Sequence, residues 1–113
     1  MKKEIADKWV AALRSGEYKQ GKDQLRRGDR FCCLGVLCNL HAQAHPDVAA
    51  EEDSRSFYMG MFGSLPPAVI DWAGMQTSDG RRGGTKPALA DLNDDGKRFS
   101  TIAKVIEAEW QTL

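Results

Sequence analysis

Apolar residues recur at spacings of three and four near both ends of the chain, a period typical of helices with one buried face. In the first stretch the apolar positions are Ile5, Trp9, Ala12 and Leu13. In the last stretch they are Phe99, Ile102, Ala103, Ile106 and Trp110. We predict a first helix that ends at Ser15 and Gly16, because glycine accepts the left-handed backbone of a helix stop. The last helix should begin near Phe99.

The next part of the chain predicts a hairpin followed by a second long helix. Residues 17–33 look extended, with RRGDR as the turn of the hairpin. A helix is expected from Cys33 or Leu34 to about Ala44. Pro46 should prevent much continuation, because proline lacks the backbone N–H that a helix interior needs.

The remaining segments are shorter. PDVAAEEDSR, residues 46–55, is expected to be an acidic, exposed connection, and SFYMGMFG, residues 56–63, a short strand whose glycines indicate a bulge. SLPPAVIDWAG should form a short helix that Gly74 closes, and Pro87 should open one more helical turn after a glycine-rich loop. We therefore expect an α+β fold, in which three main helices and one or two short ones pack on a small antiparallel sheet, in a single domain of residues 1–113.

Length and composition narrow the class of protein. With 113 residues, 42% hydrophobic and 28% charged, the chain has the size and balance of one soluble globular domain. No apolar run approaches the roughly 18 residues of a membrane span, and the charged residues Glu4, Asp7 and Lys8 interrupt any export signal. The net charge is zero, so attraction to nucleic acid or anionic membranes must come from local patches.

All three cysteines lie in the sequence FCCLGVLC, and two are adjacent, which fits a reduced cytosolic protein. Cys33, Cys38, His41 and His45 have the spacing C-x4-C-x2-H-x3-H, which would suit a metal if a helix face presented them. Zinc sites usually take one pair of ligands from a turn, whereas Cys38 lies within the expected helix. A cysteine nucleophile would need a base near Cys33, and both histidines lie further along the same helix. We expect buried apolar cysteines, with a metal site as the minor alternative, and no catalytic residue.

Two further motifs match known sites only in part. DLNDDG, residues 91–96, resembles the start of an EF-hand loop, but Ile102 stands where a bidentate glutamate is needed. Asx turns and a favourable charge before the last helix explain its aspartates. DGRRGGTK, residues 79–86, is glycine-rich and basic but lacks the G-K-[ST] order of a P-loop. We expect no bound cofactor.

Two basic loops are the strongest candidates for a binding site. One is DGRRGGTK, and the other is YKQGKDQLRRGDR, residues 18–30. Extended back to Arg14, over residues 14–30, the second region has six cations and three anions. Each arginine of a pair can donate two hydrogen bonds to one phosphate, which lysine cannot do with the same geometry. An anionic ligand is expected here, and the sequence leaves open whether the two loops meet in space.

Four segments of the chain also resemble one protein family. They are W-x3-LRSGEYKQGKDQLR, FCCLGVLCNL, LPPAVIDWAG and LADLNDDGKRFSTIAKVIE, and together they cover over half of the sequence. In this order they are similar to a family of short proteins encoded by tailed phages and prophages. The resemblance implies no catalytic residues. It implies a setting, that of a phage accessory protein in the cytoplasm of an infected bacterium.

In that setting we expect a host anti-defence protein that binds and sequesters a small anionic signal, such as a cyclic nucleotide, and is not an enzyme. The predicted ligand-binding residues are Tyr18, Lys19, Gln20, Arg26, Arg27, Arg81, Arg82 and Asn93. A homo-oligomer is expected, because an interface between copies usually builds such a pocket. The alternative is an inhibitor that binds a host defence or regulatory protein directly. A DNA-binding regulator is disfavoured by the zero net charge and the lack of a basic recognition helix.

Overall fold

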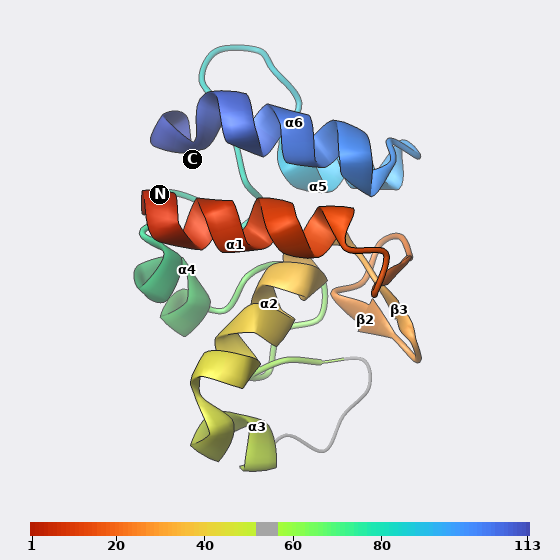
Figure 1. Ribbon diagram of the computed structural model, residues 1–113, viewed down its shortest axis with the longest axis vertical. Helices are drawn as coiled ribbons and strands as arrows, with labels where there is room; N and C mark the ends of the chain where they lie inside the picture. Colours follow the sequence, from red (N-terminus) through yellow and green to blue (C-terminus); the bar gives the residue numbers. More distant parts are fainter. Residues whose placement is uncertain (52–56) are drawn as a thin grey trace.

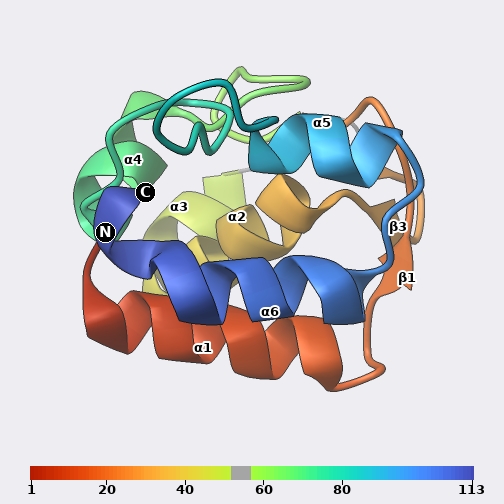
Figure 2. The same ribbon diagram turned by 90° about the horizontal axis from the view of Figure 1, so that it is seen from above.

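Two helices from opposite ends of the chain lie side by side in the structure. The computed structural model describes residues 1–51 and 57–113. Helix α1 spans Lys3–Arg14 and helix α6 spans Phe99–Glu109, and the two run antiparallel, so that both chain ends lie on one side of the molecule (Figures 1 and 2). Both helices were predicted, and their buried positions follow the predicted period, with Ala6 and Val10 joining the buried face of α1.

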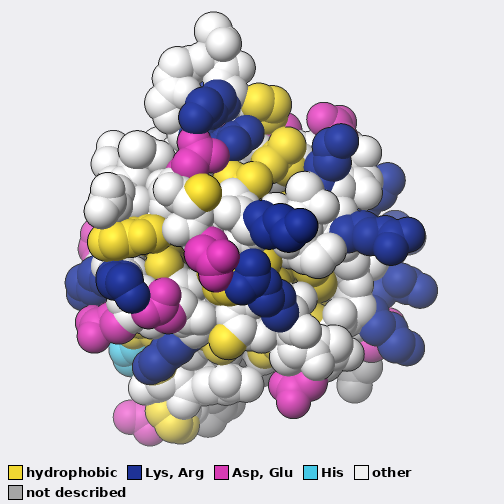
Figure 3. All heavy atoms as spheres, turned by 45° about the horizontal axis from the view of Figure 1, so that its top comes forward, with side chains coloured by type: hydrophobic (Ala, Val, Ile, Leu, Met, Phe, Trp, Pro, Cys, Tyr) yellow, Lys and Arg dark blue, Asp and Glu magenta, His cyan; other side chains and the backbone are white. Residues whose placement is uncertain are grey.

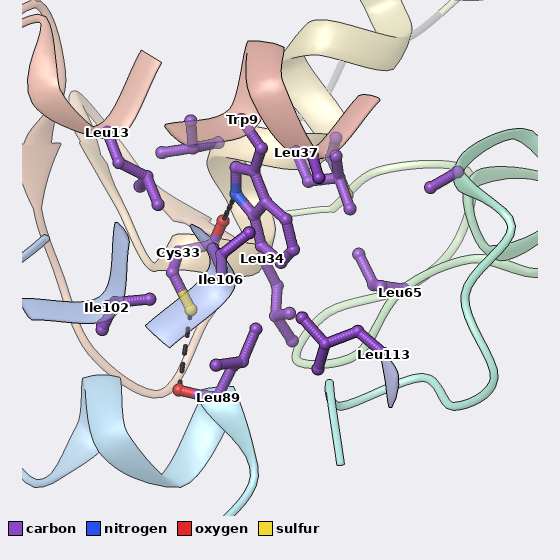
Figure 4. Close-up of a cluster of buried hydrophobic side chains, with 14 of the residues drawn as sticks. Trp9, Leu13, Cys33, Leu34, Leu37, Leu65, Leu89, Ile102, Ile106 and Leu113 are labelled. Carbon is purple, nitrogen blue, oxygen red and sulfur yellow. Dashed lines mark hydrogen bonds between the residues drawn. The ribbon is translucent and has the colours of Figure 1, made fainter. Parts of the chain in front are cut away.

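Helix α2, Cys33–Ala44, packs against this pair and forms the centre of the core. Its first six residues, from Cys33 to Cys38, are all buried. The Trp9 indole of α1 is fully buried and donates a hydrogen bond of 2.9 Å to the Cys33 carbonyl (Figure 4). This bond satisfies the buried indole N–H and ties α1 to the first turn of α2. The predicted bounds of α2 are confirmed.

The sheet is small and mixed. Strands β1 (Lys19–Gln20), β2 (Arg26–Arg27) and β3 (Arg30–Phe31) lie in the order β1–β3–β2. The predicted RRGDR hairpin is confirmed, because β2 and β3 pair antiparallel around Gly28. The expectation of an entirely antiparallel sheet is wrong, because β1 pairs with β3 in parallel. A short loop reverses the chain between β1 and β2, so a third strand inserted between them must run parallel to one of the two.

Three short helices and a final turn complete the fold. Helices α4 (Pro67–Ala73) and α5 (Leu89–Asp94) were predicted, and Gly74 closes α4 in the left-handed conformation with φ 69°. Helix α3 (Pro46–Glu51) was not predicted, because Pro46 was interpreted as the end of a helix, although proline is tolerated in the first turn of one. A 3-10 helix, η1, follows α6 at Trp110–Thr112.

The segment predicted as a strand over residues 56–63 contains, from residue 57 on, only one bridge, Tyr58 with Met61. Its turn has positive φ at Met59 and Gly60, as in a two-residue hairpin turn. The predicted acidic connection is helical over Pro46–Glu51, and its residues 52–55 lie outside the described residues. The α+β fold class is confirmed. Within the described residues, no helix has both the length and the apolar character to cross a membrane.

Gly35 of α2 provides a test of this packing, because the helix passes directly over the backbone of Leu25. A Cβ atom on residue 35 would lie 1.6 Å from the Leu25 carbonyl oxygen. We predict that Gly35→Ala lowers the free energy of unfolding by about 1–3 kcal/mol or more, despite the higher helix propensity of alanine. Gly83→Ala is the control, because a Cβ there meets nothing within 4 Å. Equal urea midpoints for the two variants would contradict the packing described.

Candidate functional site

Asn93, a predicted ligand contact, is instead fully buried at the end of α5. Its side-chain oxygen accepts hydrogen bonds from the Cys33 backbone N–H and from Gln20 Nε2, both at 3.0 Å. Its amide nitrogen donates to the Gly21 carbonyl at 2.7 Å. A buried amide that loses such partners is destabilising by roughly 1–3 kcal/mol. The structure therefore gives Asn93 a structural role, and its burial argues against the predicted contact with a ligand.

Gln20, also a predicted ligand contact, extends the same network. Its Nε2 donates to the Lys97 carbonyl at 2.7 Å as well as to Asn93, and its Oε1 accepts from the Phe99 backbone N–H at 3.1 Å. Phe99 N–H lies in the first turn of α6, where a helix has no internal acceptor for it. Gln20 thus serves as a long-range cap, and its polar atoms are committed to the fold rather than to a ligand.

The hairpin presents fewer available cations than the sequence indicates. Arg26 donates to the Gly28 carbonyl at 2.7 Å, and its guanidinium lies 4.9 Å from the centre of the Phe31 ring. Lys19 forms an exposed ion pair of 3.0 Å with Asp29. Of the predicted ligand-binding residues in this region, only Arg27 makes no side-chain hydrogen bond or ion pair within the described part of the chain.

Tyr18, the remaining predicted contact in this region, is half-buried. Its hydroxyl accepts a hydrogen bond of 2.6 Å from the Asn39 side chain, and its ring packs edge-on against Phe31. Lysine and arginine side chains still gather at this end of the molecule, at the right edge of the surface in Figure 3. They form a convex charged edge, and Arg27 is its best-placed group for an external anion.

The second basic loop lies beside a shallow pocket of about 390 Å³. The residues that line it are Gln76, Thr77, Arg81, Arg82, Gly83, Gln111 and Thr112. Two of these, Arg81 and Arg82, were predicted as ligand-binding residues. Sequence reasoning missed the glutamines and threonines. Gln76 and Thr77 adjoin the basic loop, which is a usable signal, but residues 111–112 reach the pocket only through the tertiary fold.

Backbone contacts hold the walls of this pocket together. The Gln76 N–H donates to the Leu113 carbonyl at 2.7 Å, which joins the loop to the end of η1. The Thr77 hydroxyl accepts from the Arg81 N–H at 2.8 Å, which closes the loop on itself. The two arginines are therefore presented by a turn with fixed internal hydrogen bonds, rather than by an extended tail.

Arg82 is the anchored member of the arginine pair. Its side chain is only 10% exposed, and it binds Glu109 at 2.8 Å and the Pro87 carbonyl at 3.0 Å. Lys86 bonds the other oxygen of Glu109. Hydrogen bonds from Lys86 and Arg82 lower the pKa of the Glu109 carboxyl, so it stays ionised and holds both cations in place. Arg82 retains its Nη2 amino group, which has no hydrogen-bond partner among the described residues.

Arg81 is the mobile member of the pair. Its side chain is 71% exposed, and only its Nε contacts an anion, Asp79 at 3.3 Å. Exposed pairs of this kind contribute little to stability, so the guanidinium can reorient at low energy. The pocket therefore combines one fixed and one adaptable guanidinium with neutral hydroxyl and amide groups.

The two basic loops occupy different ends of α6. The hairpin is held at the first residue of the helix by the bond between Gln20 and Phe99, and Arg82 is held at the last residue by Glu109. Ten residues of α-helix span about 15 Å. The loops do not form one site, which answers the question that the sequence left open.

The three cysteines are all buried. Burial raises the pKa of Cys32 to about 11 and that of Cys33 and Cys38 well above the ordinary thiol value. The Cys33 thiol donates to the Leu89 carbonyl at 3.6 Å (Figure 4). Thiols in this state are protonated at neutral pH, which leaves them poor nucleophiles and poor metal ligands.

The histidines are engaged near the other end of α2. His41 Nδ1 shares a hydrogen bond of 2.7 Å with the Tyr58 hydroxyl, and burial lowers the pKa of its imidazole. His45 stacks on His41, with ring centres 4.1 Å apart. Among the described residues there is no cluster of three or more His, Cys, Asp or Glu side chains that could hold a metal ion.

Comparison with known protein families gives a match to most of the chain. The model of a family described as "Domain of unknown function (DUF8296)" matches residues 1–110. No curated protein and no solved structure matches the chain.

The burial of the cysteines predicts their reactivity. In native buffer at pH 8, iodoacetamide should leave all three unmodified over a period in which it alkylates them fully in denaturant, because buried thiols are neither charged nor accessible. Mass spectrometry of the intact protein measures the number of added groups. Rapid modification of any one thiol in the native protein would contradict this description.

Proposed function

This chain belongs to the DUF8296 family, and we propose that it acts by binding a small anionic ligand rather than by catalysis. The observation that carries the proposal is the pocket beside η1, which Arg81 and Arg82 both line. A pair of guanidinium groups is suited to phosphate, because each can donate two parallel hydrogen bonds to its oxygens.

The charges around the pocket support an anionic ligand. Three cations, Arg81, Arg82 and Lys86, lie with two anions, Asp79 and Glu109. Glu109 holds Arg82 in place before any ligand arrives, so less side-chain entropy is lost on binding. The exposed Arg81 can then exchange Asp79 for a phosphate oxygen. Hydroxyl and amide groups on the remaining walls provide neutral hydrogen bonds that orient the rest of the ligand.

The setting implied by the family resemblance suggests what the ligand does. In a phage accessory protein, we propose that the pocket sequesters a small nucleotide signal of the host, such as a cyclic nucleotide, and so acts against host defence. Sequestration requires affinity and no chemical step. Because the pocket is shallow, a second copy of the chain would help to enclose the ligand, which is the reason to expect a homo-oligomer.

A second function, direct inhibition of a host protein, is favoured by a different surface. Phe57 and Phe62 are 47% and 43% exposed, and their rings lie 5.5 Å apart beside the exposed Met59. Aromatic residues and methionine are enriched in protein–protein interfaces. A host protein partner is therefore the alternative to a nucleotide ligand.

We predict that at least one linear or cyclic nucleotide raises the melting temperature of the protein, because a ligand that binds only the folded state stabilises that state. Arg81→Ala should lower the affinity for that nucleotide about tenfold or more, because a charge-assisted hydrogen bond contributes about 1.5–3 kcal/mol. Titration calorimetry measures the affinity. Arg98→Ala is the matched control, since Arg98 is exposed and makes no side-chain bond in the described chain.

The same measurements separate the two basic loops and the two functions. If Arg27→Ala loses affinity for the nucleotide while Arg81→Ala keeps it, the binding site lies at the hairpin and the assignment to the pocket is overturned. If no anionic nucleotide raises the melting temperature, the ligand-binding proposal fails and the protein-partner alternative is favoured.

A further inference from the structure

The outward face of the small sheet carries three cations in one row. The strand register pairs Lys19 with Arg30 across β1 and β3, and it pairs Arg30 with Arg27 across β3 and β2. Residues that are paired in this way point to the same face of a sheet, and all three of these residues are exposed. Neighbouring strands lie about 4.8 Å apart, so the row spans roughly 10 Å of the surface.

The other row of the sheet faces the protein and is partly buried. It consists of Gln20, Phe31 and Arg26, which are paired in the same register. Gln20 bonds the buried Asn93 of α5. The Arg26 guanidinium lies 4.9 Å from the centre of the Phe31 ring. The sheet therefore keeps its structural contacts on the inner face and presents a row made of cations alone on the outer face.

The outer row is electrostatically unfavourable in the protein alone, because like charges directly opposite each other on neighbouring strands destabilise a sheet. Asp29 offsets one of the three charges through its ion pair of 3.0 Å with Lys19. Arg30 donates to the neutral Gln20 carbonyl at 3.2 Å. Arg27 has no side-chain partner within the described residues. The repulsion between the two arginines is left in place, and an anion outside the protein would relieve it.

We propose that this outer row binds the phosphate backbone of double-stranded nucleic acid. The row is separate from the arginine pocket, which lies at the other end of α6. A duplex carries one negative charge per roughly 1.7 Å of its axis, so it presents several phosphates to a row of this length. Each arginine can donate two parallel hydrogen bonds to a phosphate. A local patch attracts an anion at short range even though the net charge of the chain is zero.

The make-up of the outer face favours a nucleic acid over a protein partner. The row contains no apolar or aromatic side chain, whereas the buried centre of a protein–protein interface is apolar. Interfaces with nucleic acid are more polar and more positively charged.

The position of the aromatic rings favours a duplex over a single strand. Proteins that hold single strands stack the bases on aromatic side chains. Here Tyr18 and Phe31 are half-buried and pack edge-on against each other. The outer row is left with contacts to phosphates, which carry no sequence information. Binding should therefore be independent of the base sequence.

The test is fluorescence anisotropy of the full chain with labelled duplexes of about 20 base pairs, at about 20 mM salt, where charges are weakly screened. Two unrelated DNA sequences and one RNA duplex show whether DNA, RNA or both supply the phosphates. We expect equal affinity for the two DNA sequences. The logarithm of the affinity for DNA should fall with the logarithm of the salt concentration with a slope of about −3, because three cations contact phosphates.

Arg27→Gln and Arg30→Gln should each weaken duplex binding severalfold and make the salt slope shallower by about 1, because one phosphate contact is lost. Arg27→Gln should not lower the urea midpoint of the free protein, because it removes a like-charge pair. Lys8→Gln is the control. Lys8 is exposed on α1 and makes no side-chain bond in the described chain, so the same change of charge there should alter neither the affinity nor the slope.

The proposal is overturned if neither the DNA nor the RNA duplexes bind, if both arginine variants bind as the parent protein does, or if Lys8→Gln weakens binding equally. Tighter binding of a single strand of the same length would contradict the assignment to a duplex. If polyglutamate binds as tightly as the duplexes and loses affinity in the same two variants, the partner is an acidic protein and the nucleic-acid proposal fails.

Discussion

The buried amide of Asn93 is the contact on which the arrangement of this fold depends. It joins the start of α2 at Cys33, the strand β1 at Gln20 and the turn at Gly21, and through Gln20 it reaches the first N–H groups of α6 at Phe99. Each of these groups would be destabilising if it were buried without a partner, so the loss of one hydrogen bond weakens the whole network. The network thereby fixes the hairpin at one end of α6 and leaves the arginine pocket at the other.

The segments on which the expected family resemblance rests lie at this network and not at the pocket. The segments YKQG, FCC and LND, which belong to the resemblance, supply the residues that meet at Asn93. The pocket residues, from Gln76 to Gly83 and at 111–112, lie outside the four segments. The residues on which the expected resemblance rests therefore include those that hold the fold together. The proposed ligand chemistry depends on residues that the resemblance does not include.

Much of the fold was predictable from the sequence, and the site was predictable only in part. Regular apolar spacing located α1 and α6, because a helix with one buried face imposes that period. Arg81 and Arg82 were found as adjacent arginines in a glycine-rich loop. The structural role of Asn93 and Gln20 could not be predicted, because a polar residue in a turn looks available until the tertiary fold buries it.

The central claim, that the fold depends on the paired amides of Gln20 and Asn93, is tested most directly by a double-mutant cycle in urea. Gln20→Ala and Asn93→Ala should each lower the free energy of unfolding by about 1–3 kcal/mol. The double variant should lose less than the sum, by on the order of 1 kcal/mol, because either change alone already breaks the shared network. Additive losses, or single variants as stable as the parent protein, would contradict the account.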